Sequence, residues 1–267
     1  MILFIIPAYN EQENIPLLLT RLQSKMKELK REYHIVLIND GSTDSTKEVA
    51  LKYKDEIPLE LIDHDTNKGV GQVFRTGFSR ALELVADGDI IITKEADNTS
   101  DIDLLNRMIG EIEGGNDLVL ASCYAKGGRI IGTTWDRIIL SFAANFIIRL
   151  IFKIKGVKTY SSFYRAYNAK MLKRAFVAYE ERLIEKHGFI CMVEMLVKLN
   201  RLPIRIVEVP MILRCDFRKG KSKMKKMKTT IEYINLLFNE LKFHKKDLQN
   251  ILMRYREYSR SKTGNAF

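Results

Sequence analysis

Two acidic side chains, Glu95 and Asp97, follow the apolar run Ile90–Thr93 and are separated by one residue. A short β-branched run that ends at acids is typical of a buried parallel strand. Acids at the carboxyl end of such a strand lie where open α/β sheets bind ligands. Because hard divalent cations prefer carboxylate oxygens, this pair could hold a metal ion against a phosphate. Alternatively, the two acids only solvate the strand end or cap a helix that begins near Asp101.

Polar turns follow two earlier apolar runs. The turn Asn39–Asp44 contains Asp40, whose carboxylate could accept hydrogen bonds from a ribose or a base. The same residues also make a good turn with no further function. The loop Pro7–Glu11 leaves the first apolar run and offers the aromatic ring of Tyr9, which can stack on a base, and an acid.

A third loop, Asn67–Gly71, opens a helical pattern with two glycines and Lys68. This composition suits a diphosphate that binds near a helix N-terminus. The loop matches neither the Walker motif nor the G-x-G-x-x-G fingerprint of dinucleotide-binding proteins, so those two classes are not indicated.

The elements that must position these loops alternate along the first half of the chain. Short apolar runs, typical of strands, are followed by helical patterns, which predicts βαβ units, an α/β fold and a mainly parallel sheet flanked by helices. The predicted strands are 2–6, 35–39, 59–62, 90–93 and 118–122, and the predicted helices are 13–30, 43–54, 70–86 and 102–112.

The second half has a different pattern. It predicts a strongly apolar helix, an irregular aromatic segment, a second helix, a strand that ends at Pro210, an amphipathic C-terminal helix and a disordered tail. In the same order these segments are 135–155, 160–167, 190–199, 204–209, 229–252 and 259–267.

The chain has a net charge of +11, and residues 214–228 carry eight basic side chains and one acid. This run implies a polyanionic partner such as a nucleotide diphosphate, a lipid phosphate or an anionic membrane. It lacks the interleaved aromatic residues of single-strand binders, so nucleic acid is not expected. The three cysteines form no zinc or disulfide pattern, which favours a reducing cytoplasm. The longest apolar segment, Ile138–Ile154, is interrupted by two basic residues, so no spanning helix is expected.

The order of these motifs resembles the GT-A glycosyltransferases of family 2, and within them the dolichol-phosphate mannose synthase and polyprenyl-phosphate glycosyltransferase branch. The likeness covers roughly residues 1–240 in unbroken order, which is far more specific than any single motif. It rests on P-A-Y-N-E, N-D-G-S-T-D, N-K-G-V-G and E-A-D, and then on Trp135-Asp136-Arg137, Phe163–Tyr167, Glu208-Val209-Pro210 and Gly220–Met224.

This resemblance implies a GT-A fold and a nucleotide-sugar donor site. Glu95, Asp97 and Thr99 match the positions that bind Mg²⁺ or Mn²⁺ on the donor diphosphate. The residues that match donor-binding positions are Pro7, Ala8, Tyr9, Glu11, Asp40, Lys68, Gly69, Ala96, Arg218 and Lys223. Lys223 belongs to the basic segment Gly220–Lys223, which matches a loop that closes over the donor phosphates.

The resemblance also implies an acceptor site. Arg137 and Ser141 match an arginine and a serine that bind the lipid phosphate, with Arg137 counted among the catalytic residues beside Glu95 and Asp97. A saccharide hydroxyl would need a general base, for which Glu194 is the candidate, although Glu194 could equally be a buried, paired acid. Residues 134–155 are interpreted as a membrane-interface helix, or else as a core helix.

The sequence departs from the family at three positions. Glu95 replaces the usual first aspartate of D-x-D, and Cys123 replaces an arginine that contacts the acceptor phosphate. The segment Thr159–Ser162 lacks the usual aspartate before the F-R pair. The C-terminal transmembrane helices of some relatives are not found, so any membrane contact is expected to be peripheral, at the cytoplasmic face.

The leading hypothesis is an inverting, metal-dependent transfer of a hexose from a nucleotide-diphosphate sugar, of the GDP-mannose or UDP-glucose type, to a polyprenyl or dolichyl phosphate. One alternative is transfer to a saccharide hydroxyl in glycan or cell-surface polysaccharide synthesis. Another is a non-catalytic nucleotide- or polyanion-binding module. The expected organisation is a GT-A domain at residues 1–225, followed by a basic, amphipathic helix and flexible tail at residues 226–267.

Overall fold

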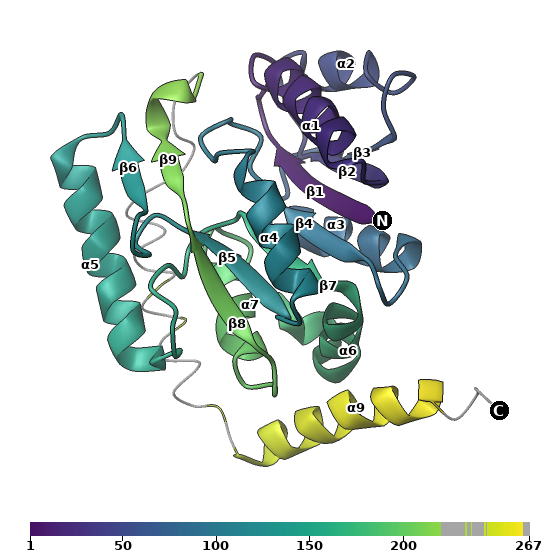
Figure 1. Cartoon of the computed structure of the whole chain (residues 1–267), viewed down its shortest axis with the longest axis vertical. Helices are drawn as coiled ribbons and strands as arrows, with labels where there is room; N and C mark the ends of the chain where they lie inside the picture. The colour runs from purple at the N-terminus through teal and green to yellow at the C-terminus, as the bar shows by residue number, and fades with distance from the viewer. Residues whose placement is uncertain (220–232, 234–235, 237–242, 244, 264–267) are drawn as a thin grey trace.

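A seven-stranded sheet forms the centre of the protein in the computed structural model, which describes residues 1–219, 233, 236, 243 and 245–263 (Figure 1). The strand order is β3-β2-β1-β4-β7-β5-β8, and every pair is parallel except those that involve β7. The strands are β1 (Ile2–Ala8), β2 (Tyr33–Asn39), β3 (Leu59–Asp63), β4 (Ile90–Thr93), β5 (Leu118–Ser122), β7 (Arg165–Asn168) and β8 (Ile206–Pro210). The predicted mainly parallel α/β sheet is confirmed.

Helices cover both faces of this sheet, which explains why its strands are continuously apolar. Along β1, Leu3 and Ile5 enter one core, whereas Phe4 and Ile6 enter the other. The first core is covered by α3 (Val70–Leu84), α6 (Ala169–Tyr179) and α7 (Cys191–Leu199), and the second by α1 (Ile15–Leu29), α2 (Thr46–Leu51) and α4 (Leu104–Glu113).

The prediction that residues 160–167 are irregular is partly wrong, because β7 begins at Arg165 and runs antiparallel between β4 and β5. Arg165 is a charged residue in a short strand, so the sequence here does not show the apolar run that is typical of a buried strand. Arg165 is fully buried, and its guanidinium donates to the carbonyl oxygens of Tyr160, Ser162 and Met192 at 2.7–2.8 Å. A buried cation is tolerated here because the carbonyls satisfy its donors.

A second, two-stranded parallel sheet lies beside the first and consists of β6 (Arg129–Ile131) and β9 (Ile212–Arg214). Helix α5 (Trp135–Phe152) follows β6, and the 3₁₀ turn η2 (Cys215–Phe217) follows β9. β9 is tied to the segment after β4, since the Arg214 amide donates to the Thr99 carbonyl at 2.8 Å. The small sheet therefore brings the basic residues after β9 to the end of β4.

The C-terminal helix α9 (Lys245–Thr263) packs on α6. Tyr255 is buried under the Arg174 guanidinium, and Arg254 pairs with Glu180, which closes the 3₁₀ helix η1 (Glu180–Leu183) onto α9. Of the amphipathic helix predicted over residues 229–252, residues 245–252 belong to α9, and most of residues 229–244 lie outside the described part of the chain. The prediction of a disordered tail over residues 259–267 is wrong as far as Thr263, since α9 continues to that residue. The expected boundary near residue 225 stays a prediction.

Candidate functional site

The carboxyl ends of β1, β2, β3 and β4 meet at one edge of the sheet because these strands run parallel. The predicted donor-site residues of the first half all lie at this edge. Pro7 and Ala8 end β1 and Tyr9 follows them, while Ala96 is buried between the two acids after β4. Parallel sheets of this kind bind ligands outside the carboxyl ends of their strands.

The loops after β1 and β2 form one hydrogen-bonded unit. The Asn10 amide donates to Ser42 Oγ at 2.9 Å, and Asn10 Oδ1 accepts from the Thr43 amide at 2.8 Å. The Glu11 amide donates to Thr46 Oγ1 at 2.7 Å. The side chains that looked like simple turn formers therefore also fix the position of Glu11 relative to β2.

Asp40 is buried at the centre of these loops, and most of its hydrogen-bonding capacity is used by the protein. Oδ1 accepts from His64 Nδ1 at 2.8 Å and from the Lys68 amide at 2.9 Å, and Oδ2 accepts from the Gly69 amide at 2.9 Å. A carboxylate has about four acceptor positions, so one remains for a ligand. Asp40 thus holds the second and third loops together, and its contact with a nucleoside stays a prediction.

The glycines of the third loop have a steric reason that sequence reasoning did not find. A Cβ atom at Gly71 would lie 1.8 Å from the Lys186 carbonyl oxygen, and the Gly71 amide donates to the His187 carbonyl at 2.8 Å. Together with Asp40, this contact occupies the amides of Lys68, Gly69 and Gly71. The predicted diphosphate contact at Lys68 and Gly69 therefore stays a prediction, and at Lys68 it would have to use the side chain.

Gly71→Ala is expected to lower the free energy of unfolding by about 2 kcal/mol or more, because the backbone at Lys186 must move. Gly110→Ala is the matched control, since a Cβ there meets nothing within 4 Å and the residue lies inside α4. That control should be neutral or stabilising by up to about 1 kcal/mol. Urea unfolding measures both, and equal stabilities would contradict the steric explanation.

The two acids after β4 differ in their surroundings. Glu95 accepts a hydrogen bond from Ser100 Oγ at 2.9 Å, and burial, together with the charge of Asp97, raises its pKa. Asp97 Oδ1 accepts from Thr99 Oγ1 at 2.6 Å and from the Thr99 amide at 3.1 Å. A divalent cation would favour both charged forms and relieve their repulsion.

Arg218 approaches Asp97 from the segment after β9. Its Nε donates to Asp97 Oδ2 at 2.8 Å, and its Nη2 donates to the same oxygen. Burial acts to raise the pKa of Asp97, but Arg218 and the Thr99 hydrogen bonds outweigh it and lower that pKa. Arg218 therefore lies at Asp97, and its contact with a donor stays a prediction, whereas Lys223 lies outside the described residues.

Lys94 is a buried residue of this site that sequence reasoning missed. Its Nζ donates to the Ser100 carbonyl at 2.8 Å and lies 4.5 Å from the ring centroid of Tyr164. Burial lowers the pKa of Lys94 to about 8. Lys94 thereby fixes the turn that carries Asp97 and Thr99, and only its position directly before Glu95 could have drawn attention to it.

The oxygens of Glu95, Asp97 and Thr99 suit Mg²⁺ or Mn²⁺. Within residues 1–219 and the other described positions, no three His, Cys, Asp or Glu side chains gather in a way that could hold a metal. The protein would supply only part of the coordination shell, which is common for Mg²⁺ bound together with substrate phosphates and water. Each oxygen of Asp97 already accepts two hydrogen bonds, so a cation would take the place of Arg218 at Oδ2. With that exchange, the residues present fit a cation shared with a diphosphate.

Ser141 and the apolar surface share helix α5. Tyr124 donates to Ser141 Oγ at 2.9 Å, and burial raises the pKa of the neighbouring Cys123 thiol to about 12, so it stays neutral. Asn145 Oδ1 accepts from the Tyr160 amide at 2.9 Å, which ties this side of α5 to the domain. The structure places Arg137 in the first turn of α5, and its side chain lies outside the described part.

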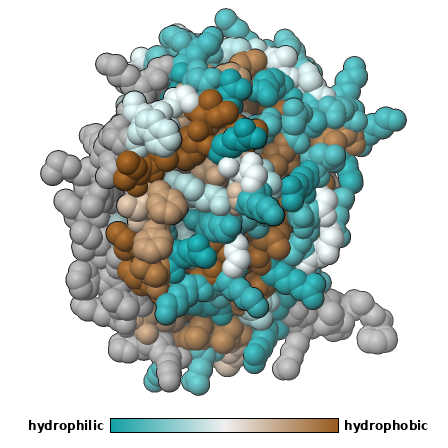
Figure 2. Space-filling view, turned by 60° about the vertical axis from the view of Figure 1, so that its left-hand side comes forward, coloured by the Kyte–Doolittle hydropathy of each residue, from teal (hydrophilic) through white to brown (hydrophobic). Residues whose placement is uncertain are grey.

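The opposite side of α5 exposes a stripe of large apolar side chains at helical spacing. Figure 2 shows hydrophobic residues gathered on the face of the molecule that carries α5. The stripe, called the α5 face below, consists of Trp135, Ile139, Phe142, Phe146, Ile147, Leu150 and Ile151. Trp135 is 79% exposed. In the described part of the chain, no helix is long and apolar enough to cross a membrane.

Glu194 is the buried, paired acid of the second interpretation. Its Oε2 accepts from the amides of Glu185 and Lys186 at 2.9 Å each, and its Oε1 accepts from Lys198 Nζ at 2.7 Å. Glu194 thus holds the loop that packs against Gly71, and both of its carboxylate oxygens accept hydrogen bonds from the protein.

Glu194→Gln is expected to lower the free energy of unfolding by about 3 kcal/mol, since it breaks a buried ion pair from one side. Turnover per folded molecule should fall by less than about tenfold, whereas loss of a general base costs about 10²–10⁴-fold. Denaturation and turnover assays on the same preparation separate the two effects. A large loss of turnover at unchanged stability would restore the general-base interpretation.

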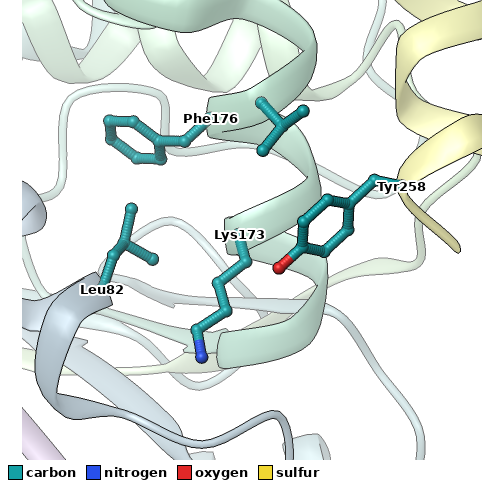
Figure 3. A pocket seen from close by; sticks show the side chains of 5 residues that line it. Leu82, Lys173, Phe176 and Tyr258 are labelled. Carbon is teal, nitrogen blue, oxygen red and sulfur yellow. The ribbon is translucent and has the colours of Figure 1, made fainter. Parts of the chain in front are cut away.

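A cavity of about 410 Å³ lies away from these residues (Figure 3). Leu82 of α3, Lys173 and Phe176 of α6 and Tyr258 of α9 line it. Lys173 donates to the Val85 carbonyl, which precedes β4, so the cavity is at the amino edge of the sheet, opposite Asp97. It is not part of the candidate site.

Solved structures share the fold of this chain. Glucosyl-3-phosphoglycerate synthase from Mycobacterium tuberculosis, crystallised with Mn²⁺ and UDP-glucose, superimposes with a TM-score of 0.60 at 16% identity, over 90% of this chain and 78% of that one. S. aureus TarS, in complex with UDP-GlcNAc, gives a TM-score of 0.58 at 20% identity, over 95% of this chain and 71% of that one. These similarities establish the GT-A fold.

Curated relatives are more similar in sequence. The undecaprenyl-phosphate mannosyltransferase of Micrococcus luteus is 31% identical over 84% of this chain and 87% of its own. The polyprenol monophosphomannose synthase of Mycolicibacterium smegmatis is 28% identical over 83% of this chain and 80% of its own. The dolichol-phosphate mannosyltransferase of Pyrococcus furiosus is 30% identical over 90% of this chain and 63% of its own. The profile of Glycosyl transferase family 2 matches residues 3–176. The chain therefore belongs to glycosyl transferase family 2 and is a glycosyltransferase.

Proposed function

We propose that this enzyme transfers a hexose from a nucleotide-diphosphate sugar to a polyprenyl phosphate at the cytoplasmic face of a membrane. The α5 face carries the proposal, because it lies on the helix that also bears Ser141 and Arg137. Contiguous exposed apolar patches mark interaction sites, and a lipid acceptor requires the enzyme to reach a membrane. Exposed basic residues near the end of the helix, Arg149, Lys153 and Lys155, could reach anionic headgroups.

In the proposed reaction, an acceptor phosphate oxygen forms a bond to the anomeric carbon as the bond from that carbon to the donor diphosphate breaks. The attack from the opposite side inverts the configuration. A cation held by Glu95 and Asp97 would neutralise charge on the departing nucleoside diphosphate. Arg218 brings a further positive charge to the same place.

Transfer to a saccharide hydroxyl is the second candidate, and Glu194 argues against it. A hydroxyl acceptor needs a general base, whereas a lipid phosphate is already an anion near neutral pH. The one acid proposed for that base is held by two amides and a lysine. A phosphate acceptor therefore requires no general base from the residues present.

A matrix of donors and acceptors tests the proposal. GDP-mannose and UDP-glucose are each supplied with Mg²⁺, Mn²⁺ or a chelator, and with either a polyprenyl phosphate or an oligosaccharide. We expect a glycolipid product that depends on the cation and on the polyprenyl phosphate. A glycosylated oligosaccharide in place of the lipid product would favour the second candidate. Full turnover in the presence of chelator would show that the reaction does not require a metal ion.

A further inference from the structure

Asn14 occupies a helix-capping position without capping the helix. It is the N-cap residue of α1, where an asparagine side chain ordinarily accepts a hydrogen bond from an amide in the first turn. Its side chain makes no such bond, although it is 2% exposed. A buried carboxamide must be satisfied elsewhere, so its partners indicate its function.

Those partners lie on three separate loops of the candidate site. Asn14 Nδ2 donates to Glu11 Oε2 at 2.6 Å and to the Lys219 carbonyl at 3.1 Å. Asn14 Oδ1 accepts from the Lys219 amide at 3.3 Å. The main-chain carbonyl of Asn14 accepts from Asn98 Nδ2 at 2.9 Å, next to Asp97. The carboxamide therefore pairs with both main-chain groups of Lys219, much as a neighbouring strand would.

This pairing fixes the base of a long side chain that must reach a defined place. Arg218 precedes Lys219 and places its guanidinium on Asp97 Oδ2. An arginine side chain has many rotamers, and holding it in one geometry costs conformational entropy. Anchoring the main chain at the adjacent residue lowers the total entropy cost, because the main-chain bonds there no longer rotate freely. Only the side-chain bonds of Arg218 must then be ordered.

We propose that Asn14 is a positioning residue that docks the Arg218–Lys219 segment onto the donor site and so keeps Arg218 at Asp97 and the donor diphosphate. The diphosphate part of this statement rests on the proposed function, whereas the docking part does not. Two experiments, one for each part, make their failures distinguishable.

Trypsin tests the docking. The peptide bond between Arg218 and Lys219 is a tryptic site, and its own N–H is the group that donates to Asn14. Asn14→Leu removes the pairing at similar side-chain volume and should accelerate cleavage at this bond about tenfold, since two hydrogen bonds are lost. Asn14→Asp keeps the acceptor oxygen but not the donor, and should give an intermediate rate.

Asn116→Leu is the matched control. Asn116 Nδ2 also donates to a main-chain carbonyl and to a glutamate, both of Glu111, at 3.0 Å each, but it lies beyond the end of α4. Its loss should leave cleavage after Arg218 within twofold of the wild type. An unchanged rate in both Asn14 variants, or equal acceleration in Asn116→Leu, would overturn the docking.

A double-mutant cycle tests the second part. Calorimetry with Mn²⁺ and either GDP or UDP measures binding to the wild type, Asn14→Leu, Arg218→Ala and the double variant. We expect each single substitution to weaken binding about tenfold and the double variant to be no weaker than Arg218→Ala, because coupled residues are not additive. Additive losses would show that Asn14 does not act through Arg218. If neither nucleotide binds the wild type, the proposed donor class fails while the trypsin result still stands.

Discussion

Asp97→Asn is expected to lower nucleotide-sugar turnover by about 10³-fold, on the scale of losing one preorganised electrostatic contact or more. The asparagine can still accept from Thr99, so the local fold should persist. It removes the charge that a cation needs. With its oxygen on Thr99, its Nδ2 donor replaces the oxygen that accepts from Arg218, so Arg218 loses this acceptor. Turnover is measured at saturating Mg²⁺ or Mn²⁺, and cation binding is measured separately by Mn²⁺ electron paramagnetic resonance.

Asp101→Asn controls for the loss of one acid in the same segment. Asp101 is partly exposed and lies 4.0 Å from Arg21, its ion-pair partner. An exposed pair of this kind contributes about 0–1 kcal/mol, so this variant should keep full turnover and wild-type stability. Full activity in Asp97→Asn would show that Asp97 does not bind a cation that the reaction requires. Glu95→Asp, which restores the usual aspartate, then shows whether the longer side chain affects cation affinity.

Much of the fold followed from local patterns, because buried parallel strands leave uninterrupted apolar runs in the sequence. The runs at 2–6 and 90–93 became β1 and β4 with boundaries that differ by at most two residues. The pattern failed at β7, where a fully buried arginine is satisfied by two nearby carbonyls, of Tyr160 and Ser162, and by the distant carbonyl of Met192. It also failed for β6 and β9, whose three-residue strands are too short to show a period.

The candidate site was predictable where its residues follow strands, and hidden where its contacts are long-range. Glu95, Asp97 and Asp40 stand at strand ends, so their clustering follows from a parallel sheet. The contacts between Asp97 and Arg218 and between Asn14 and Lys219 join residues 121 and 205 positions apart. No local pattern records such a pair. Gly71 shows the converse, since its need for glycine comes from the Lys186 carbonyl and not from a phosphate.

The double substitution Ile139→Glu with Phe146→Glu is expected to reduce binding to anionic vesicles by about 100-fold or more. Each of these side chains contributes roughly 1.5–3 kcal/mol when its apolar surface leaves water, and each new carboxylate is repelled by anionic lipid. Both residues lie on the exposed side of α5. Phe146 is two residues from buried Ile148, which places the two side chains on opposite sides of the helix, so the fold should persist. Co-sedimentation with vesicles containing phosphatidylglycerol measures the binding.

The same variant separates membrane contact from chemistry. Turnover of a polyprenyl phosphate embedded in vesicles should fall with binding, whereas turnover of a short-chain, water-soluble polyprenyl phosphate should stay near the wild-type rate, because Glu95, Asp97 and Arg218 are untouched. The double substitution Leu17→Glu with Leu51→Glu is the control, since both are exposed leucines, on α1 and α2, and together they carry the same change of charge. If this control weakens vesicle binding as much, net charge explains the effect and the α5 face is not the membrane contact. If neither variant weakens it, the membrane contact lies on another surface.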